Sequence, residues 1–238
     1  MLSLNVTYPA ILGNFGRHLV KGRTESRAFL AWFLEQYYRL EETDAQDSVC
    51  DGTDDKGVDG VFVDDNFERV DIFQSRLVQN NAKTLGDTQL KEFVGTLAQF
   101  RDPSRLQKMV QKTTNHEFRN LMVNGHVADK LAKGYSLRGV FITNATRDAN
   151  AVAYLAGQPN LLLYDAQELQ AKYIPSGPTP LISGSASFDI FGFACAEYSV
   201  GQAKVIIAPL RAMDLVKMSG FANGELFAWN VRQSLAGC

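Results

Sequence analysis

A β-hairpin is predicted by the segment Asp59-Gly-Val-Phe-Val-Asp-Asp-Asn-Phe-Glu-Arg-Val-Asp-Ile-Phe-Gln74, which Ser75 and Arg76 follow directly. β-Branched and aromatic residues are concentrated at 58–63 and again at 69–74, as is typical of two strands. Between them, Asp64-Asp65-Asn66 favours a turn, because Asp and Asn side chains bond their own backbone and tolerate left-handed angles.

The register of this hairpin decides which side chains meet. If the hairpin closes around Asn66 and Phe67, Asp59 lies opposite Gln74, and directly paired residues have Cβ atoms roughly 5 Å apart. Side chains alternate along a strand, so Gln74 and Arg76 share one face of the ribbon with Asp59. A slip of one residue moves Gln74 to the other face. The predicted cluster therefore depends on the register.

A helix is predicted upstream, over Glu25 to Leu40, and Glu35 interrupts its almost wholly apolar run. A carboxylate on an apolar helix face is costly unless it is paired, protonated or close to a metal ion. The order of parts is then a helix with Glu, an Asp, and a Gln-x-cation pair, which is the order found in metal-dependent phosphodiesterases. Hard oxygen ligands suit Mg²⁺ or Mn²⁺, which would activate water and stabilise the developing charge.

Each of these residues also has a purely structural interpretation. Asp59 at a strand start can be solvated or bonded to a turn, and Gln74 can be an ordinary polar residue on a strand. Glu35 can pair with Arg39 at the favourable i, i+4 spacing. Arg76 can be a surface residue. The hairpin register, which brings Asp59 to Gln74, is the reason to prefer a site.

Two motifs resemble a known family. The first is Asp51-Gly-Thr-Asp-Asp-Lys-Gly-Val-Asp-Gly60 with the hairpin and Gln74-Ser-Arg76, and the second is Gly224-Glu-Leu-Phe-Ala-Trp-Asn-Val-Arg-Gln-Ser-Leu235. Together they resemble abortive infection phage resistance (AIPR) proteins, whose N-terminal nuclease domain belongs to the PD-(D/E)XK, restriction-endonuclease-like group. The resemblance covers most of the chain and is strongest at these two segments.

The resemblance implies a function and a set of site residues. It implies a metal-dependent DNA endonuclease of a bacterial anti-phage abortive infection system, using Mg²⁺ or Mn²⁺. Asp59 is then the main metal ligand, Gln74 a second, and the Ser75 carbonyl a third. Glu35 is the plausible acid of the first helix, and Arg76 is the catalytic cation. Nucleases of this kind often cut duplexes as dimers, so a homodimer is among the expected assemblies.

The chain departs from the family pattern in two ways. Arg76 stands where the family has Lys; a guanidinium can stabilise a phosphate but cannot give up a proton. Lys83 or Lys91 could supply an amine instead. Family members also continue beyond the Asn-Val-Arg segment, whereas this sequence ends at Cys238, so we expect a truncated C-terminal region.

Composition and charge set expectations for disulfides, localisation and nucleic-acid binding. The chain has 238 residues, 45% of them hydrophobic, and three widely separated cysteines, which form no disulfide framework. No apolar run reaches the roughly 20 residues of a membrane helix, and no signal peptide is visible, so we expect a cytoplasmic protein. The net charge of −2 argues against a protein that binds nucleic acids nonspecifically through its overall charge. A candidate basic strip follows the hairpin, although we expect most of it to be a solvated helix face: Lys91, Arg101, Arg105, Lys108, Lys112, Arg119, Lys130 and Lys133.

Strand and helix signals alternate along the chain. They predict an α/β fold, a restriction-endonuclease-like mixed sheet flanked by helices, with a small C-terminal α+β extension. The expected domains are 1–175, nuclease-like, and 181–238, the start of the AIPR-type C-terminal region, with the Pro- and Gly-rich segment 174–180 as linker. After the hairpin we expect helices over 87–100, 104–133, 149–155 and 165–173, strands over 137–143 and 161–164, and in the extension paired strands over 187–199 and 203–208 with a helix over 211–218.

Three hypotheses remain from different classes. The first is a magnesium-dependent DNA endonuclease. The second is a catalytically impaired nucleic-acid-binding or assembly module on the same fold, motivated by Arg76. The third is a protein-interaction fragment with no nucleic-acid role, which the slightly acidic balance favours.

Overall fold

The computed structural model describes residues 4–19, 23–174, 195–200, 203–207, 209 and 211–216. The chain divides into two compact units, Met1–Tyr173 and Ile174–Cys238. The predicted linker lies at this division, and most of it falls outside the described residues. Within the described part of the chain, no helix combines the length and apolar character that crossing a membrane requires.

The first unit is built on one mixed sheet of four strands: β1 (Gly60–Asp64), β2 (Arg69–Arg76), β3 (Ser136–Thr143) and β4 (Leu161–Tyr164). The strands follow one another in sequence order across the sheet. β1 is antiparallel to β2, whereas β2, β3 and β4 are parallel. The predicted mixed sheet flanked by helices is confirmed at this level.

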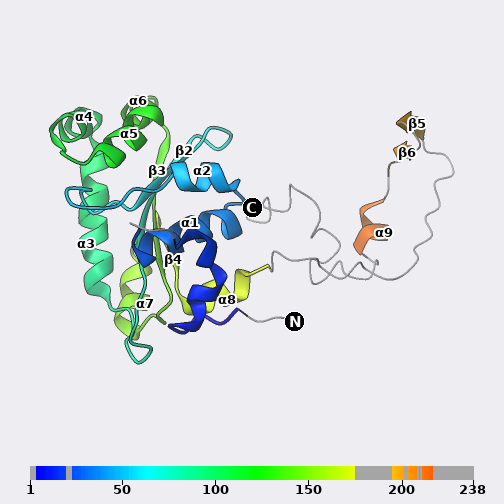
Figure 1. Cartoon of the computed structure of the whole chain (residues 1–238). Helices are drawn as coiled ribbons and strands as arrows, with labels where there is room; N and C mark the ends of the chain where they lie inside the picture. Colours follow the sequence, from blue (N-terminus) through cyan, green and yellow to red (C-terminus); the bar gives the residue numbers. More distant parts are fainter. Residues whose placement is uncertain are drawn as a thin grey trace. The chain divides into compact units, whose positions relative to one another are not determined.

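Helices cover both faces of the sheet, and Figure 1 shows α3 and α4 on one side and α1 and α8 on the other. The α-helices of this unit are α1 (Glu25–Tyr37), α2 (Glu42–Asp47), α3 (Asp87–Ala98), α4 (Pro103–Lys112), α5 (His116–Asn124), α6 (Val127–Ala132), α7 (Ala149–Leu155) and α8 (Ala166–Lys172), and short 3₁₀ turns are η1 (Ala10–Asn14), η2 (Gly16–His18) and η3 (Gln99–Arg101). Because parallel strands need crossovers, helices on both faces are the expected consequence.

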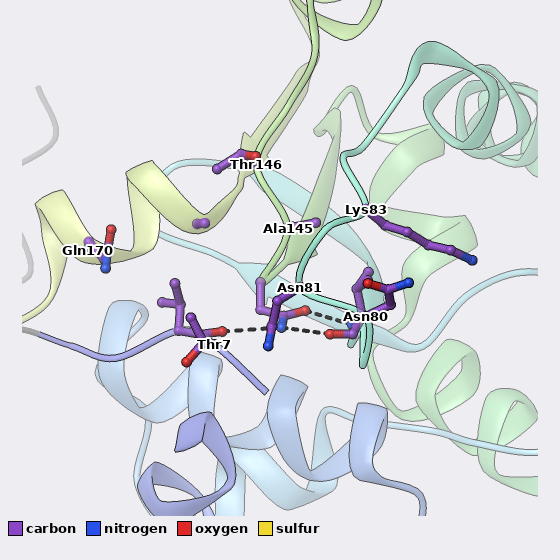
Figure 2. Close-up of a pocket in the computed structure, with 11 residues that line it drawn as sticks. Thr7, Asn80, Asn81, Lys83, Ala145, Thr146 and Gln170 are labelled. Atoms are coloured by element: carbon purple, nitrogen blue, oxygen red, sulfur yellow. Dashed lines mark hydrogen bonds between the residues drawn. The ribbon is translucent and has the colours of Figure 1, made fainter. Parts of the chain in front are cut away.

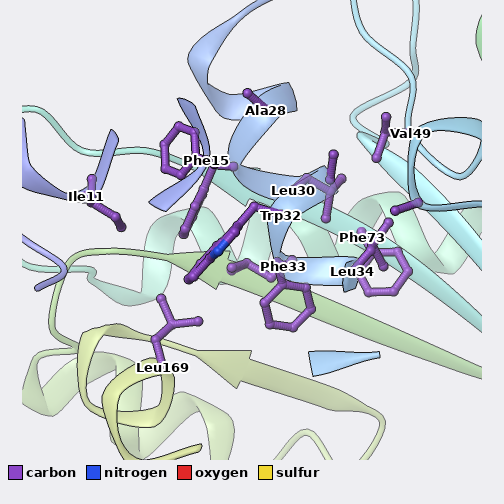
Figure 3. Close-up of a cluster of buried hydrophobic side chains, with 14 of the residues drawn as sticks. Ile11, Phe15, Ala28, Leu30, Trp32, Phe33, Leu34, Val49, Phe73 and Leu169 are labelled. Atoms are coloured by element: carbon purple, nitrogen blue, oxygen red, sulfur yellow. The ribbon is translucent and has the colours of Figure 1, made fainter. Parts of the chain in front are cut away.

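The two hydrophobic cores follow from this layering. On one face, the apolar run of α1 packs against η1, α8 and the β2 residue Phe73; Figure 3 shows Trp32 and Phe33 of α1 at the centre of this cluster. On the other face, Val70 and Ile72 of β2 pack against helices α3 to α7. Alternate residues of β2 therefore enter opposite cores, as strand geometry requires. Burial on both faces fixes the register of the strand.

The predicted hairpin is confirmed, and its register is the predicted one. Five pairs run from Gly60 with Phe73 to Asp64 with Arg69. The Asp64 carboxylate accepts the N–H groups of Asn66 and Phe67, each at 3.2 Å, which is the turn chemistry expected of Asp. At the other end, a Cβ on Gly60 would stand 2.7 Å from the Ser48 carbonyl oxygen, so only glycine fits at the start of β1.

The second unit contains a two-stranded antiparallel ribbon, β5 (Ala196–Val200) with β6 (Ala203–Ile207), and a short helix α9 (Ala212–Val216). The predicted paired strands and helix agree with these elements where the two overlap. The predicted strand residues 187–194 and the second AIPR-like motif, at 224–235, lie outside the described residues.

Candidate functional site

Asp59 lies at the entrance of β1 and is bonded to both neighbouring segments. Its carboxylate Oδ2 accepts the backbone N–H of Ser75 at 2.6 Å. Its own N–H donates to the Phe73 carbonyl at 2.9 Å, and its carbonyl accepts the N–H of Cys50 at 2.8 Å. Asp59 has therefore left the regular ladder, in which the predicted register would have paired it with Gln74. The two residues are nonetheless the first on each side beyond the last pair, at the same edge of the sheet.

The electrostatic state of Asp59 is unusual. The pKa of its carboxyl is raised from an ordinary 3.8 to about 7, mainly by burial. The Ser75 N–H lowers this pKa, and the negative charges of Asp55 and Asp51 contribute to raising it. Burial and the nearby Asp51 and Asp54 likewise raise the pKa of Asp55. No cation in the described residues forms an ion pair with Asp59. A bound cation would stabilise a carboxylate that is partly buried among other carboxylates.

Gln74 contributes an unsatisfied oxygen. Its Oε1 atom is buried and has no hydrogen-bond partner among the described residues. A buried amide oxygen without a partner costs about 1–3 kcal/mol, so a cation or a hydrogen-bond donor that bound beside it would be stabilised. Gln74 alternates with Ser75 along β2, so it shares the sheet face of Ile72, and Arg76 follows on that same face.

Ser75 and Arg76 complete the predicted motif. The Ser75 side chain is buried, and its hydroxyl donates to the carbonyl of Ser26 in the first turn of α1 at 2.9 Å. Arg76 is exposed at the end of β2 and has no ion-pair partner within the described part of the chain. Its guanidinium is therefore free to receive an anion from solvent, for example a phosphate.

The loop 51–57, which delivers the chain to Asp59, is held by the junction between α4 and α5. Asp54 accepts the Thr114 N–H at 2.7 Å and the Thr113 hydroxyl at 3.1 Å, and it also pairs with Lys56. The Lys56 ammonium and the two threonines hold the pKa of Asp54 well below its ordinary value. Asn115 donates to the carbonyls of Asp51 and Thr53 at 3.0 and 3.2 Å. These bonds fix the acidic loop beside β1.

Glu35 belongs to a different cluster. It is buried near the C-terminal end of α1, where its carboxylate pairs with Arg17 and lies 3.2 Å from His18 Nε2. It forms neither a hydrogen bond nor an ion pair with Asp59 or with Arg39. Glu35 is nine residues beyond Ser26, which corresponds to about 13 Å along a helix. The structure thus places Glu35 away from the Asp59–Ser75 contact and gives its burial a structural reason, an ion pair with η2.

Glu25 is the acid of α1 that lies near the hairpin end, and sequence reasoning missed it as a site residue. It adjoins Ser26, whose carbonyl accepts the Ser75 hydroxyl. Its carboxylate accepts the Tyr8 hydroxyl at 3.2 Å and the Gln79 amide at 3.3 Å. The available signal was its position at a helix start, where a side chain projects from the end of the helix and not into the core.

A pocket lies beyond the carboxyl ends of β2 and β3, at the end of the sheet where Gln74 and Arg76 lie. Its volume is about 180 Å³, and Figure 2 shows Asn80, Asn81 and Lys83 on one wall and Thr146 and Gln170 on another. Crevices at the carboxyl ends of parallel strands are common ligand sites. Lys83, one of the two alternative amines, lines this pocket, whereas the other, Lys91, pairs with Asp87 at 2.6 Å.

The donor set at Asp59 fits a hard cation only in part. Among the described residues, no three His, Cys, Asp or Glu side chains gather into a group that could hold a metal ion. The predicted set has one carboxylate, one amide oxygen and one backbone carbonyl, from Asp59, Gln74 and Ser75. Oxygen donors of these three kinds suit Mg²⁺, which keeps several waters and needs few protein ligands. The uncompensated Asp59 and the unpartnered Gln74 oxygen support this fit.

Comparison of the chain with protein-family models, with curated proteins and with solved structures gave no match. The chemistry of this site is therefore argued from its own residues. Asp59 and Gln74 lie at one end of the hairpin, and Arg76 follows Gln74 by two residues on the same face of β2. Oxygen donors near an exposed guanidinium are groups that can bind a divalent cation and an anion such as a phosphate.

Proposed function

We propose that this protein is a metal-dependent nuclease that hydrolyses phosphodiester bonds, with DNA as the first substrate to test. One observation carries the proposal: the partly buried Asp59, whose pKa is raised to about 7, lies at the same hairpin end as the unpartnered Gln74 oxygen. A divalent cation would satisfy both groups at once. The α/β sheet flanked by helices is compatible with a restriction-endonuclease-like fold, which is part of the proposal.

The roles of the residues follow from their positions. Asp59 and Gln74, with the Ser75 carbonyl, would hold Mg²⁺ or Mn²⁺, and the bound ion supplies an activated water and stabilises negative charge. The Ser75 N–H orients the Asp59 carboxylate through the 2.6 Å hydrogen bond. The exposed Arg76 binds the scissile phosphate through two parallel N–H donors. Glu25 is added as a second acid near the site.

The decisive experiment measures cleavage of plasmid and linear DNA with Mg²⁺, with Mn²⁺ and with a chelator. We expect cleavage by the parent chain only with the divalent ion, and none by Asp59→Asn. Asp65→Asn is the matched control, because Asp65 is an exposed acid at the far end of the same hairpin, paired there with Lys130. Cleavage that survives Asp59→Asn would overturn the proposal.

Arg76 favours a second candidate, a nucleic-acid-binding module that has lost most of its activity. An arginine cannot act as a base, so a mechanism that needs a neutral amine at this position would fail. The substitution Arg76→Lys separates the two candidates. A gain of cleavage from an inactive parent supports the binding module, and strong activity of the parent rejects it.

The biological role that we propose, defence against phage, is supported by the resemblance to AIPR proteins. Its test is the efficiency of phage plating on bacteria that express the chain. We expect protection that disappears with Asp59→Asn, and protection by the substituted chain would argue against a nuclease as its cause.

A further inference from the structure

Helix α4 carries a row of exposed cations. Arg105, Lys108 and Lys112 follow one another at spacings of three and four residues, so they lie on one face of the helix. All three are exposed, and none has an ion-pair partner within the described residues. Arg101, in the 3₁₀ turn directly before the helix, is also exposed and has no ion-pair partner among the described residues. We call Arg105, Lys108 and Lys112 the α4 face.

The structure distinguishes this face from three other cations of the predicted basic strip, which have partners. Lys91 pairs with Asp87 at 2.6 Å, and Lys130 pairs with Asp65 at 2.6 Å. The Arg119 guanidinium donates to the carbonyls of Val110 and Thr113, where it closes the turn between α4 and α5. These three cations have structural partners, whereas the α4 face has no ion-pair partner in the part of the chain that the structure describes.

The α4 face is not needed for the helix to fold. Asp102 caps the helix by accepting the N–H groups of Ser104 and Arg105 at 2.9 and 3.1 Å. Leu106 is fully buried on the opposite side and anchors α4 in the second core. Like charges three or four residues apart on a helix destabilise it slightly. A bound polyanion would reverse that cost.

The position of α4 connects its cations with the candidate site. Its C-terminal end continues into Thr113 and Thr114, which bond to Asp54 of the loop 51–57, and that loop leads into Asp59. From Arg105 to Lys112 the face extends about 10 Å along the helix axis. Its three cations are therefore close enough together to contact neighbouring phosphates of one strand.

We propose that the α4 face binds the phosphate backbone of a nucleic acid and directs it towards the Asp59 site. The second half of this proposal rests on the proposed nuclease function, whereas the binding itself does not require cleavage. Binding through backbone charges carries no sequence information, so we expect similar affinity for unrelated sequences of equal length. The exposed Gln107 and Gln111 on the same helix offer additional neutral donors to phosphate oxygens.

The test measures binding to a short DNA duplex over a range of salt concentrations, by fluorescence anisotropy, with the full chain carrying Asp59→Asn so that cleavage does not interfere. Each phosphate contact contributes about 0.9 to the slope of log K against log salt. We expect Lys108→Gln to reduce the slope by about 0.9, and the triple change Arg105→Gln, Lys108→Gln, Lys112→Gln to reduce it by about 2.7 and weaken binding more than tenfold at low salt.

Lys172→Gln is the matched control, because Lys172 is an exposed lysine on α8, which packs on the other face of the sheet. It should leave the slope unchanged. Thermal melting of each variant checks folding, and glutamine keeps the helix propensity of lysine. An unchanged slope in the triple variant, or a parent that does not bind DNA in a salt-dependent manner, would overturn the proposal. Binding of the parent and the triple variant to anionic lipid vesicles is measured in parallel. The proposal would also be overturned if the triple variant lost binding to the vesicles but kept its binding to DNA.

The two proposals fail in different ways. If the chain binds DNA through the α4 face but never cleaves it, the proposed nuclease activity is wrong and the proposed binding face is supported. If the triple variant binds as well as its parent while Asp59→Asn abolishes cleavage, the proposed binding face is wrong and the nuclease activity is supported.

Discussion

The backbone N–H of Ser75 donates to the carboxylate of Asp59 at 2.6 Å, and the hydroxyl of the same serine donates to the carbonyl of Ser26 at 2.9 Å. One residue of β2 thus joins the entrance of β1 to the first turn of α1. The three segments that carry candidate acids and ligands meet at this serine. The relationship makes Glu25, and not Glu35, the helical acid that lies near the hairpin end.

The raised pKa of Asp59 predicts how stability depends on pH. Between its ordinary value of 3.8 and about 7, the unfolded chain has lost this proton while the folded chain retains it. The free energy of unfolding therefore falls as pH rises through this window, by at most about 4 kcal/mol from this group, and the loss is complete above pH 7. Asp59→Asn removes that slope, so the variant should be more stable than the parent at pH 8 and similar to it near pH 4.

Denaturant unfolding at several pH values in a chelator measures this difference. Asp65→Asn serves as control: the Lys130 ammonium lowers the pKa of Asp65, so the contribution of Asp65 changes only below its ordinary value of 3.8, and this variant should keep the parent's slope from pH 4 to 8. A parent and Asp59→Asn variant with parallel curves from pH 4 to 8 would show that Asp59 is not the buried titrating group.

Gln74→Glu should strengthen binding of Mg²⁺, because it replaces an unpartnered amide oxygen with a carboxylate beside Asp59. Without metal, a second carboxylate near Asp59 should lower stability at neutral pH, by about 1–3 kcal/mol. The measurement is the midpoint of thermal unfolding against Mg²⁺ concentration. We expect a larger rise for Gln74→Glu than for the parent, and little rise for Asp59→Asn; equal rises in all three would place metal binding elsewhere.

Substitution of Glu35 should affect mainly the stability of the fold, whereas substitution of Glu25 should affect mainly cleavage. Glu35 is buried against Arg17 and His18, so Glu35→Gln should cost about 1–3 kcal/mol of stability without changing the dependence of cleavage on metal. Glu25 is more exposed and bonded to Tyr8 and Gln79, so Glu25→Gln should change stability by less than about 1 kcal/mol while reducing cleavage. Calorimetry and cleavage rates on the same preparations check both, and the reverse pattern would restore Glu35 as the acid of the site.

Arg76→Ala should leave folding almost untouched, within about 0.5 kcal/mol, since the side chain is exposed and unpaired within the described residues. If Arg76 contacts the scissile phosphate, cleavage should fall by at least tenfold. Lys133→Ala controls for the loss of one positive charge, because Lys133 is an exposed cation in the connection between α6 and β3. Equal cleavage by both variants would remove Arg76 from the mechanism.

Asp71 should be the most sensitive acid of the hairpin for stability. It is fully buried and accepts two bonds from Arg138, at 2.8 and 2.6 Å, and one from the Tyr38 hydroxyl at 2.9 Å. Asp71→Ala removes the carboxylate that pairs with both Arg138 and Arg69, and it should cost about 3–5 kcal/mol. Urea unfolding measures the loss. A cost below about 1 kcal/mol would mean that solvent replaces the carboxylate.

Local sequence signals predicted most of the first unit because they act over short distances. The turn at Asp64 to Asn66 and the strand residues on either side determined the hairpin and its register. Asp165 predicted the start of α8, where its carboxylate accepts the Glu168 N–H at 3.0 Å. Where the prediction depended on which distant segments meet, it was less successful. Glu35 was assigned to the site from its apolar helix face, but its partners, Arg17 and His18, come from η2.

The sequence alone determined the α/β class, the mixed sheet and the positions of Asp59, Gln74 and Arg76 at one hairpin end, because alternation and turn chemistry are local. Only the tertiary structure decided that Ser75 joins Asp59 to α1 and that Glu25 lies near the candidate site. It also decided that Lys91 and Lys130 form ion pairs, whereas Arg105, Lys108 and Lys112 form none with the residues that the structure describes. Ion pairs and burial depend on contacts between segments far apart in the chain, which no local pattern encodes.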